Sequence, residues 1–426
     1  MPAPDPRTRW MDLLRRMDAE MEARGFASHD PYDILGSPLV VWLRSRRSNP
    51  LNSITEKQPS ARDRLVRRLL APLYQTTAGT MAYRRLCGIP KVAHPKTRGL
   101  LLQAYARLAR DRAEGDWLDK ARACAAWLME HADQHGFGKY CWGLPWVWPS
   151  GPGNIIPAFG PQSTMTAVIG LGFTDLFEAA GDPAYLDVAR SCCDFFQEHL
   201  HVDRSDPEAW ALSYTPYDRT HILNVNLHCA ALLCRVARLT GEAGYRDFAL
   251  RITEFTVRHQ RPDGAWHYAA PQDGDINAVD VYHTGDILEY FSLMRRDLDA
   301  FPYEEAFRRG VDFFLARFFE PDGRPWYTET DRFPVDSHAC CQALITLAEL
   351  AESDPRALAM AQRTADWTTR EMMDPARPRM YYRRYETGLV DKTWAMAWGD
   401  AWMVKGLSLL LHALDRAAGQ QAPEPA

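Results

Sequence analysis

The chain has 426 residues and a formal net charge of -5, with 46% hydrophobic and 25% charged residues. These values are ordinary for a globular protein and provide no basic surface, so we expect no nucleic-acid partner. Nine cysteines, an odd number that falls mostly within helical patterns, favour free thiols in a reducing compartment over a disulfide framework. Without an evident secretory leader or an apolar run of membrane-spanning length, we expect a cytoplasmic protein with no membrane span.

The first 60 residues are expected to form an extension that wraps the rest of the chain. Arg9–Gly25 has the pattern of a short amphipathic helix, and His29–Pro38 is rich in turn formers. No linker, charge run or low-complexity block divides residues 61–418, so we predict one domain there. Residues 419–426 are expected to be a disordered tail.

From residue 61 onward, apolar residues recur with the period of an α-helix. Short connections such as Gly181-Asp182-Pro183 and Gly241-Glu242-Ala243-Gly244 separate helices that we group in pairs. The predicted pairs are Thr97–Arg112 with Trp117–His131, Thr164–Ala180 with Pro183–His199, Asn226–Thr240 with Tyr245–His259, Thr284–Leu298 with Glu304–Phe319, His338–Glu352 with Arg356–Met373, and Ala397–Leu414 with Arg62–Leu73.

The two helices of each pair differ in character. The first is nearly apolar on all sides and contains small residues such as Gly170, Gly172 and Ala343, which is typical of a buried helix. The second carries charge on one side, as in Ala249–His259, and suits an outer layer. About six such hairpins predict an all-α (α/α)6 toroid, with minor β-structure only in the long loops.

Aromatic and acidic residues recur in the loop before each inner helix, at intervals of roughly 55 to 60 residues. Loops of this length are usually functional, and all of them should gather on one rim of the toroid. The five stretches are Cys141–Ser163, Trp210–Asn226, Trp266–Asp286, Trp326–Gln342 and Tyr381–Asp400.

Aromatic side chains on these loops suggest a carbohydrate groove. Flat rings suit the apolar face of a pyranose, so Trp142, Trp266, Trp398 and Tyr217 are candidate substrate-binding residues. The alternative is that such rings fill the centre of the toroid, because buried Trp and Tyr need only one polar partner.

Carboxylates stand near the starts of successive inner helices. Asp218, Asp280 and Asp336 are the candidate catalytic residues, because glycosidic bond cleavage needs one protonated and one ionised carboxyl group. Asp280 is the candidate general acid, since apolar neighbours raise a carboxyl pKa, and Asp218 the candidate base or nucleophile. Asp286, just inside a predicted helix, is a candidate substrate ligand. The competing interpretation for each helix-start Asp is an N-cap.

His283 and His338 occupy corresponding positions, each two or three residues after an Asp at a helix start. They could bind substrate hydroxyls or transfer protons near neutral pH, or serve only as structural residues. Arg219 on the same rim could bind an acidic sugar. Four ligands at metal spacing are absent from the sequence, so we expect no metal and no cofactor.

A series of motifs resembles VpsJ-type proteins, which are (α/α)6-toroid proteins associated with bacterial exopolysaccharide biosynthesis. The series runs from about residue 29 to residue 415 and consists of DPYDILGSP, CWGLPW, SYTPYD, DGAWHY, HTGDILE, DSHACCQALI and WGDAWMVKGL. The resemblance implies a pathway without fixing a reaction. It places the matching positions Asp33, Trp142, Tyr217, Asp218, Asp280, His283, Asp336, His338 and Trp398 at the site.

These patterns together predict an enzyme that acts on an oligo- or polysaccharide, acidic or neutral, by carboxylate acid/base glycoside hydrolysis. A polysaccharide lyase or uronate C5-epimerase is the alternative, in which Tyr or His removes a proton and Arg neutralises the carboxylate. A glycan-binding assembly factor is the non-enzymatic alternative.

Overall fold

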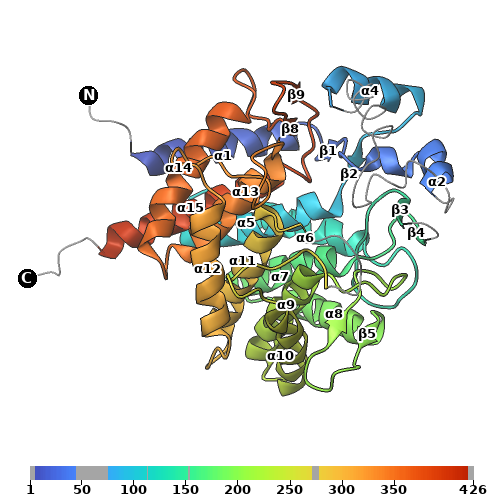
Figure 1. Ribbon diagram of the computed structural model, residues 1–426, viewed down its shortest axis with the longest axis vertical. Coiled ribbons are helices and arrows are strands. Elements are labelled where there is room, and N and C mark those ends of the chain that lie inside the picture. The colour runs from blue at the N-terminus through green and yellow to red at the C-terminus, as the bar shows by residue number, and fades with distance from the viewer. Residues whose placement is uncertain (1–4, 45–74, 113, 152–153, 271–277, 421–426) are drawn as a thin grey trace, which may run out of the picture.

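The computed structural model describes residues 5–44, 75–112, 114–151, 154–270 and 278–420. Helices dominate these residues and the strands are two to four residues long, so the predicted (α/α)6 toroid is confirmed (Figure 1). Six inner helices surround the axis. They are α5 (Pro95–Asp111), α7 (Ser163–Ala180), α9 (Leu223–Thr240), α11 (Val281–Asp297), α13 (Ser337–Leu350) and α15 (Asp400–Gln420).

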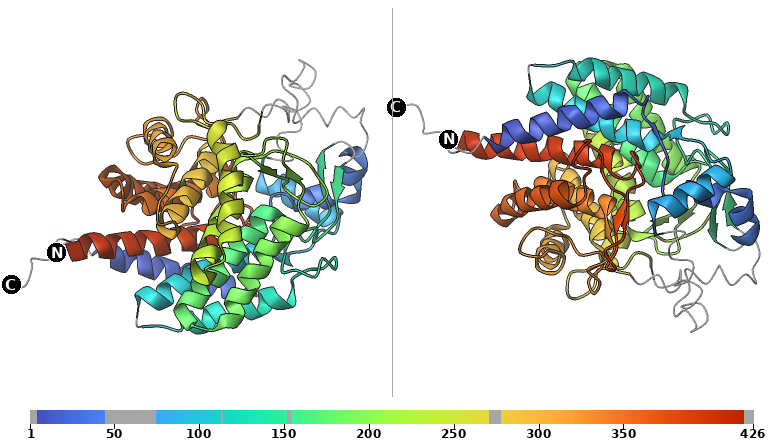
Figure 2. Two further views of the ribbon diagram at one scale, coloured as in Figure 1. Left: turned by 90° about the horizontal axis from the view of Figure 1, so that it is seen from below. Right: turned by 90° about the horizontal axis from the view of Figure 1, so that it is seen from above.

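Six further helices form the outer layer. They are α1 (Pro6–Glu22), α6 (Trp117–Glu130), α8 (Pro183–Glu198), α10 (Ala243–Arg258), α12 (Glu304–Arg317) and α14 (Pro355–Glu371). The N-terminal helix α1 lies along α15 and buries Trp10, Leu14 and Met17 there, so it occupies the outer position beside the last inner helix (Figure 2). The helix predicted for that position, Arg62–Leu73, lies outside the described residues.

The inner helices are buried on every side, as their composition predicts. All fourteen residues of α13 are buried. In α7, a Cβ added to Gly170 would lie 2.3 Å from a methyl group of Leu232 in α9, so glycine there allows the two helices to approach closely. Gly181 and Gly241 end α7 and α9 in the left-handed conformation, at φ 72° and 78°. This is a common way for a helix to stop before a short connection.

The remaining elements lie in or beside the long loops at the rim where the inner helices begin. The short helices are η1 (Asp33–Gly36), α2 (Pro38–Arg44) and α4 (Thr77–Leu86). In the described part of the chain, the strands form four small antiparallel sheets. They are β1 (Ala27–Ser28) with β2 (Val92–Ala93), β3 (Trp148–Gly151) with β4 (Asn154–Ile156), β5 (Val202–Asp203) with β6 (Ala211–Leu212), and β7 (Val335–Asp336), β8 (Arg383–Arg384) and β9 (Val390–Asp391).

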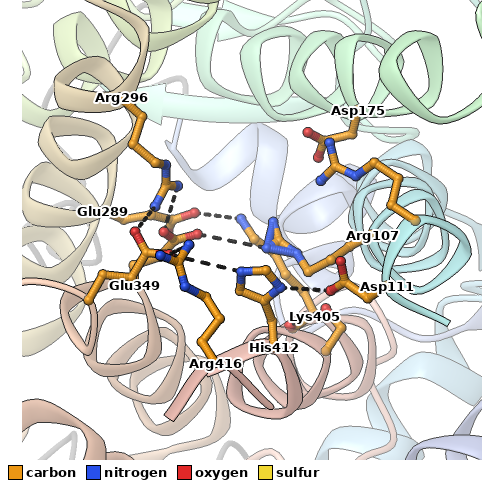
Figure 3. A network of polar contacts seen from close by, with 12 residues as sticks. Arg107, Asp111, Asp175, Glu289, Arg296, Glu349, Lys405, His412 and Arg416 are labelled. Atoms are coloured by element: carbon orange, nitrogen blue, oxygen red, sulfur yellow. Dashed lines mark hydrogen bonds and ion pairs between the residues drawn. The ribbon is translucent and has the colours of Figure 1, made fainter. Parts of the chain in front are cut away.

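At the opposite end, ion pairs link each inner helix, or in the case of α13 the turn just after it, to the next inner helix, and together they form a closed cycle. We call this cycle the ionic ring; Figure 3 shows part of it. Its contacts are Arg110–Glu178 at 2.7 Å, Arg238–Glu178 at 2.5 Å, Arg235–Asp297 at 2.6 Å, Arg296–Glu349 at 2.7 Å, Arg416–Glu352 at 2.6 Å and His412–Asp111 at 2.8 Å. The inner helices all end here, where the helix dipole favours positive charge, and this accounts for the abundance of arginine.

Candidate functional site

A cavity of about 340 Å³ opens at the rim where the inner helices begin. The starts of α5, α7, α11 and α13 and the loop before α15 all contribute to it, so it is built from several repeats. Tyrosines from four loops line it, and burial raises their pKa values, which keeps their hydroxyl groups protonated as hydrogen-bond donors. They are Tyr32, Tyr214, Tyr268 and Tyr327, joined by Tyr282 from the first turn of α11.

Asp280 and His283 form a pair on the cavity wall. Asp280 is the N-cap of α11, and one of its oxygens accepts the backbone N–H of His283 at 2.8 Å. The other oxygen lies 2.6 Å from His283 Nδ1. Burial would lower the pKa of His283, but the carboxylates of Asp280 and Asp286 outweigh it and raise the pKa above its usual value. Asp280 therefore acts both as the helix cap and as the partner that favours the charged form of His283.

His338 lies in the same cavity in a different environment. It is buried, and neither ring nitrogen has a hydrogen-bond partner within the described part of the chain. Its ring packs 4.0 Å from the Tyr282 ring and 4.4 Å from the Trp402 ring, measured between centroids. Burial, assisted by the positive charge of Lys96, lowers the pKa of His338 well below the usual value. The imidazole is therefore neutral at neutral pH.

Asp336, Arg383 and Trp398 form a second polar group on the cavity wall. Asp336 caps α13 by accepting the backbone N–H groups of His338 and Ala339 at 2.9 and 3.2 Å. Its other oxygen accepts a hydrogen bond of 2.7 Å from Arg383. The Trp398 indole N–H points at the same carboxylate, at 3.3 Å. Asp336 thus has the capping role considered for it and also fixes two cavity side chains.

Below the cavity lies a smaller space of about 50 Å³ lined by Asn224, His228 and His283. Asp286 is fully buried beside it and accepts hydrogen bonds from Asn224 at 3.0 Å and His228 at 3.1 Å. Oxygen Oδ1 of Asp286 and ring nitrogen Nδ1 of His228 have no partner among the described residues. Asp286 does not line the main cavity, and it acts there through its charge, which favours the protonated forms of His283 and Lys96.

Asp218, proposed as the base or nucleophile, lies outside the residues that line the cavity. It accepts hydrogen bonds from the backbone N–H groups of Tyr214, Thr215 and Thr220 and from the hydroxyl groups of both threonines. Five donors on one carboxylate organise the turn before α9. The structure therefore brings Asp280 and Asp336 together without Asp218.

Four of the predicted substrate-binding residues also lie away from the cavity. Trp142 and Trp266 are each only 2% exposed, and their indole N–H groups donate to the carbonyls of Leu128 and Thr256. They fill the core, as the alternative interpretation proposes, because a satisfied indole packs well there. Tyr217 and Arg219 are exposed and do not line the cavity. Trp398 is the predicted tryptophan that does.

Lys96 and Tyr32 line the cavity but are not among the predicted residues. The position of Lys96 within its helix could have identified it from the sequence. It is the second residue of α5, and the second residues of α11 and α13 are Tyr282 and His338. Asn224, the second residue of α9, lines the smaller space. The second residue of an inner helix therefore points toward the axis in several repeats.

Within the described residues, no group of three or more His, Cys, Asp or Glu side chains is arranged to hold a metal ion. In the same part of the chain, no helix is both long and apolar enough to cross a membrane. All nine cysteines are free, and eight are buried.

The sequence matches no protein-family profile and no curated protein, so the resemblance to VpsJ-type proteins stays a prediction. Solved structures resemble it in fold. A cellobiose 2-epimerase from Bacillus thermoamylovorans superposes with a TM-score of 0.59 at 12% identity, over 74% of this chain and 87% of the epimerase. A GH76 alpha-mannanase from Bacteroides thetaiotaomicron gives 0.56 at 12%, over 76% and 88%. An unsaturated glucuronyl hydrolase specific for heparin gives 0.54 at 11%, over 76% and 89%. At these identities the likeness is one of fold, and that fold is the (α/α)6 toroid.

Proposed function

We propose that this protein is a carbohydrate-processing enzyme that moves a proton on a sugar by means of His283 and His338. The observation that carries the proposal is that one cavity holds two histidines in opposite environments: His283 is bonded to the Asp280 carboxylate, and neither ring nitrogen of His338 has a partner among the described residues. These environments displace the two pKa values in opposite directions. Such a divergence is the usual sign of an acid and a base assigned to one reaction. The Tyr282 ring lies between them, at 4.3 Å from His283 and 4.0 Å from His338.

The roles follow from the protonation states. Neutral His338, with two free nitrogens, would remove a proton from a sugar carbon next to a C=O group. The electron pair of that C–H bond becomes a C=C bond, and the π electrons of the C=O group move to its oxygen. His283, whose charged form Asp280 favours, would stabilise this oxygen or donate a proton to it. Return of the proton to the opposite face gives an epimer. Return to the former carbonyl carbon, while the hydroxyl proton of the first carbon passes to His283 as that carbon becomes C=O, gives an isomer, and neither reaction requires an oxidant.

A proton transfer on a sugar is consistent with the solved structures of similar fold, which include cellobiose 2-epimerases and a D-mannose isomerase. The resemblance to VpsJ-type proteins would set such a reaction in bacterial exopolysaccharide metabolism. β-Elimination, as in a polysaccharide lyase, begins with the same proton abstraction.

Glycoside hydrolysis by Asp280 and Asp336 is the second candidate, favoured because both carboxylates line the cavity. It requires one of them to be a protonated acid. Burial raises carboxyl pKa values most clearly at Asp30, to about 6, and at Asp400, to about 7, and neither residue lines the cavity. Asp280 and Asp336 are instead bonded to His283 and Arg383. This arrangement supports histidine chemistry more than carboxylate chemistry.

Solvent isotope exchange tests the proposal. The protein would be incubated in D₂O with D-glucose, D-mannose, cellobiose, N-acetylglucosamine and D-glucuronate, and NMR would follow the loss of C–H signals and the appearance of new sugars. We expect exchange with at least one probe, and its loss in His283→Asn and His338→Asn. His131→Asn is the matched control, because His131 also stacks on a tryptophan, at 4.0 Å from Trp127, outside the cavity.

The other functions predict different results. Release of monosaccharide from a glycan without isotope exchange would support hydrolysis. An ultraviolet-absorbing unsaturated product would indicate a lyase. Binding of a probe with neither exchange nor cleavage would favour a glycan-binding factor and would refute the histidine mechanism.

A further inference from the structure

Lys96 is the one cation of the cavity wall that has no anionic partner among the described residues. Its ammonium group makes no ion pair and no hydrogen bond within that part of the chain, and it stands 5.3 Å from the centre of the Trp398 ring. The lysine lies in the first turn of α5 and lines both the main cavity and the smaller space below it. Burial lowers the pKa of Lys96, and the more distant carboxylates of Asp30 and Asp286 partly offset this.

The other charges of the cavity wall are already matched. Asp280 is bonded to His283, and Asp336 is bonded to Arg383. These pairs leave Lys96 as the cation of the wall that no carboxylate contacts among the described residues. The inner helices also begin at this rim, and the positive ends of their dipoles add to the preference for an anion. The cavity therefore complements a ligand with a single negative charge better than a neutral one.

We propose that Lys96 binds a carboxylate of the substrate, and that the substrate is a sugar acid of the uronate class. This deepens the proposed function, on which it rests only in taking the same cavity as the sugar site. The single unmatched charge fits a carboxylate better than a phosphate, which carries a charge nearer two. The nearby ring of Trp398, which lines the same cavity, supplies an apolar surface for the sugar ring.

The carboxylate also has a consequence for the chemistry. A carbon next to a carboxylate gives up its proton more readily when the carboxylate charge is neutralised. A lysine that neutralises it would assist removal of the adjacent proton by His338. The uronate carbon that bears the carboxylate would then be the centre where the proton is removed, and the C–H electron pair would be held on the carboxyl group until a proton returns.

Matched ligands separate charge recognition from general sugar binding. The probes are D-glucuronate, D-galacturonate and D-mannuronate, each paired with its methyl ester, which has the same sugar ring without the charge. Calorimetry would give Kd for the wild type and for Lys96→Met. We expect at least one acid to bind about tenfold or more tightly than its ester, since a charge-assisted hydrogen bond is worth at least that much. Lys96→Met should remove this preference.

Two further variants guard against a purely structural effect. Lys96→Arg keeps the charge and should retain part of the preference. Lys392→Met is the matched control. Lys392 also stands over an aromatic ring, 4.9 Å from the centre of the Tyr381 ring, but it is exposed and does not line the cavity. This variant should bind the acids and esters as the wild type does. If Lys96→Met does not fold, Lys96→Gln serves in its place, with circular dichroism to confirm the fold.

The proposal is overturned if the wild type prefers no acid over its ester, or if the preference survives Lys96→Met. Tighter binding of glucose 6-phosphate that depends on Lys96 would overturn the assignment of a carboxylate and indicate a phosphate. If no probe shows isotope exchange but binding of the acid still depends on Lys96, the proposed reaction is refuted and the assignment of Lys96 stands. The two proposals can therefore fail independently.

Discussion

The Asp280 carboxylate lies 2.6 Å from Nδ1 of His283, at the first turn of α11. This contact fixes the imidazole in one orientation and leaves Nε2 as the nitrogen available to the cavity. The same carboxylate caps the helix through the backbone N–H of His283. One residue thus sets the start of the helix and the direction of the ring, and it favours the charged form of the imidazole.

Asp280→Asn should lower the pKa of His283 while leaving the helix intact. Asparagine is as good an N-cap as aspartate, so the fold should persist. Without the negative charge, burial dominates and disfavours the imidazolium. NMR titration of the histidine C–H signals would measure the change directly. With a probe sugar that shows isotope exchange, the decline of the exchange rate on the alkaline side should shift to lower pH. The exchange rate near neutral pH should fall roughly ten- to hundredfold.

Asp354→Asn is the matched control, because Asp354 is also an aspartate N-cap, at the start of the outer helix α14. It should leave the titration of His283 unchanged. An unchanged His283 pKa in Asp280→Asn would mean that the pair does not control the charge of the ring.

His338→Phe should abolish proton transfer without destabilising the protein. The two ring nitrogens of His338 are buried without partners among the described residues, which costs free energy in the native state. A phenyl ring would keep the contacts with Tyr282 and Trp402 and remove that cost. We expect the unfolding midpoint to stay the same or rise, with loss of isotope exchange. A decrease in stability of more than about 2 kcal/mol would show that the nitrogens have stabilising partners.

His338 should also affect the pH dependence of stability. Its native pKa lies well below the usual 6.5, so the unfolded chain binds a proton that the native state does not. The contribution of His338 to the free energy of unfolding should therefore be constant above pH 6.5 and should fall as the pH drops below 6.5. His283, whose pKa is raised, contributes stability that is present below 6.5 and lost as the pH rises. Comparison of wild type with His338→Phe from pH 5 to 8 isolates the His338 contribution, and the variant should show the flatter acid side.

The helical period of the sequence predicts the toroid because each repeat carries the same pattern of buried and half-buried faces. The exact starts of the inner helices are harder to predict. The expected start at Thr284 is three residues later than the observed Val281, and Thr97 is two residues later than Pro95. Asp280 and His94 cap these helices earlier than the apolar pattern suggests, because a cap depends on side-chain hydrogen bonds that periodicity does not detect.

This error in the helix starts also explains why part of the site was missed. Lys96 lies before the predicted start of its helix, so its position in the first turn was hidden. The sequence groups Trp142 and Trp266 with Trp398, because composition alone does not reveal which side of a loop faces the core. Asp218 could not be distinguished from Asp280, since both precede an inner helix and only three-dimensional contacts reveal the five donors on Asp218.

Asp218→Ala should destabilise the turn before α9 without changing the pH profile of catalysis. Removing the carboxylate leaves the N–H groups of Thr215 and Thr220 without their acceptor, at a cost of about 1–3 kcal/mol. Chemical denaturation would measure the loss, and isotope exchange at low temperature would measure activity. If Asp218→Ala is as stable as the wild type but loses most of its isotope-exchange activity, Asp218 takes part in catalysis.

Asp297→Asn should weaken the ionic ring and lower stability while leaving the site intact. Asp297 is 2% exposed in its side chain and accepts from Arg235 at 2.6 Å and Arg238 at 2.7 Å. Loss of the charge leaves the buried Arg235 with the longer contacts to Asp175 at 3.3 Å and Glu178 at 3.9 Å. Breaking a buried pair by removing one partner costs about 3 kcal/mol or more. Urea denaturation should show this decrease in the free energy of unfolding.

Asp119→Asn provides the control for the ring, because Asp119 pairs with Arg122 at 3.2 Å with its side chain 80% exposed. An exposed pair of this kind adds little stability, so the unfolding midpoint should not change. Ligand binding by folded Asp297→Asn should match the wild type, since Asp297 lies at the opposite end of the inner helices from the cavity. Equal stability of the two variants would mean that solvent screens the ring despite its burial, and that packing of the inner helices alone keeps the toroid closed.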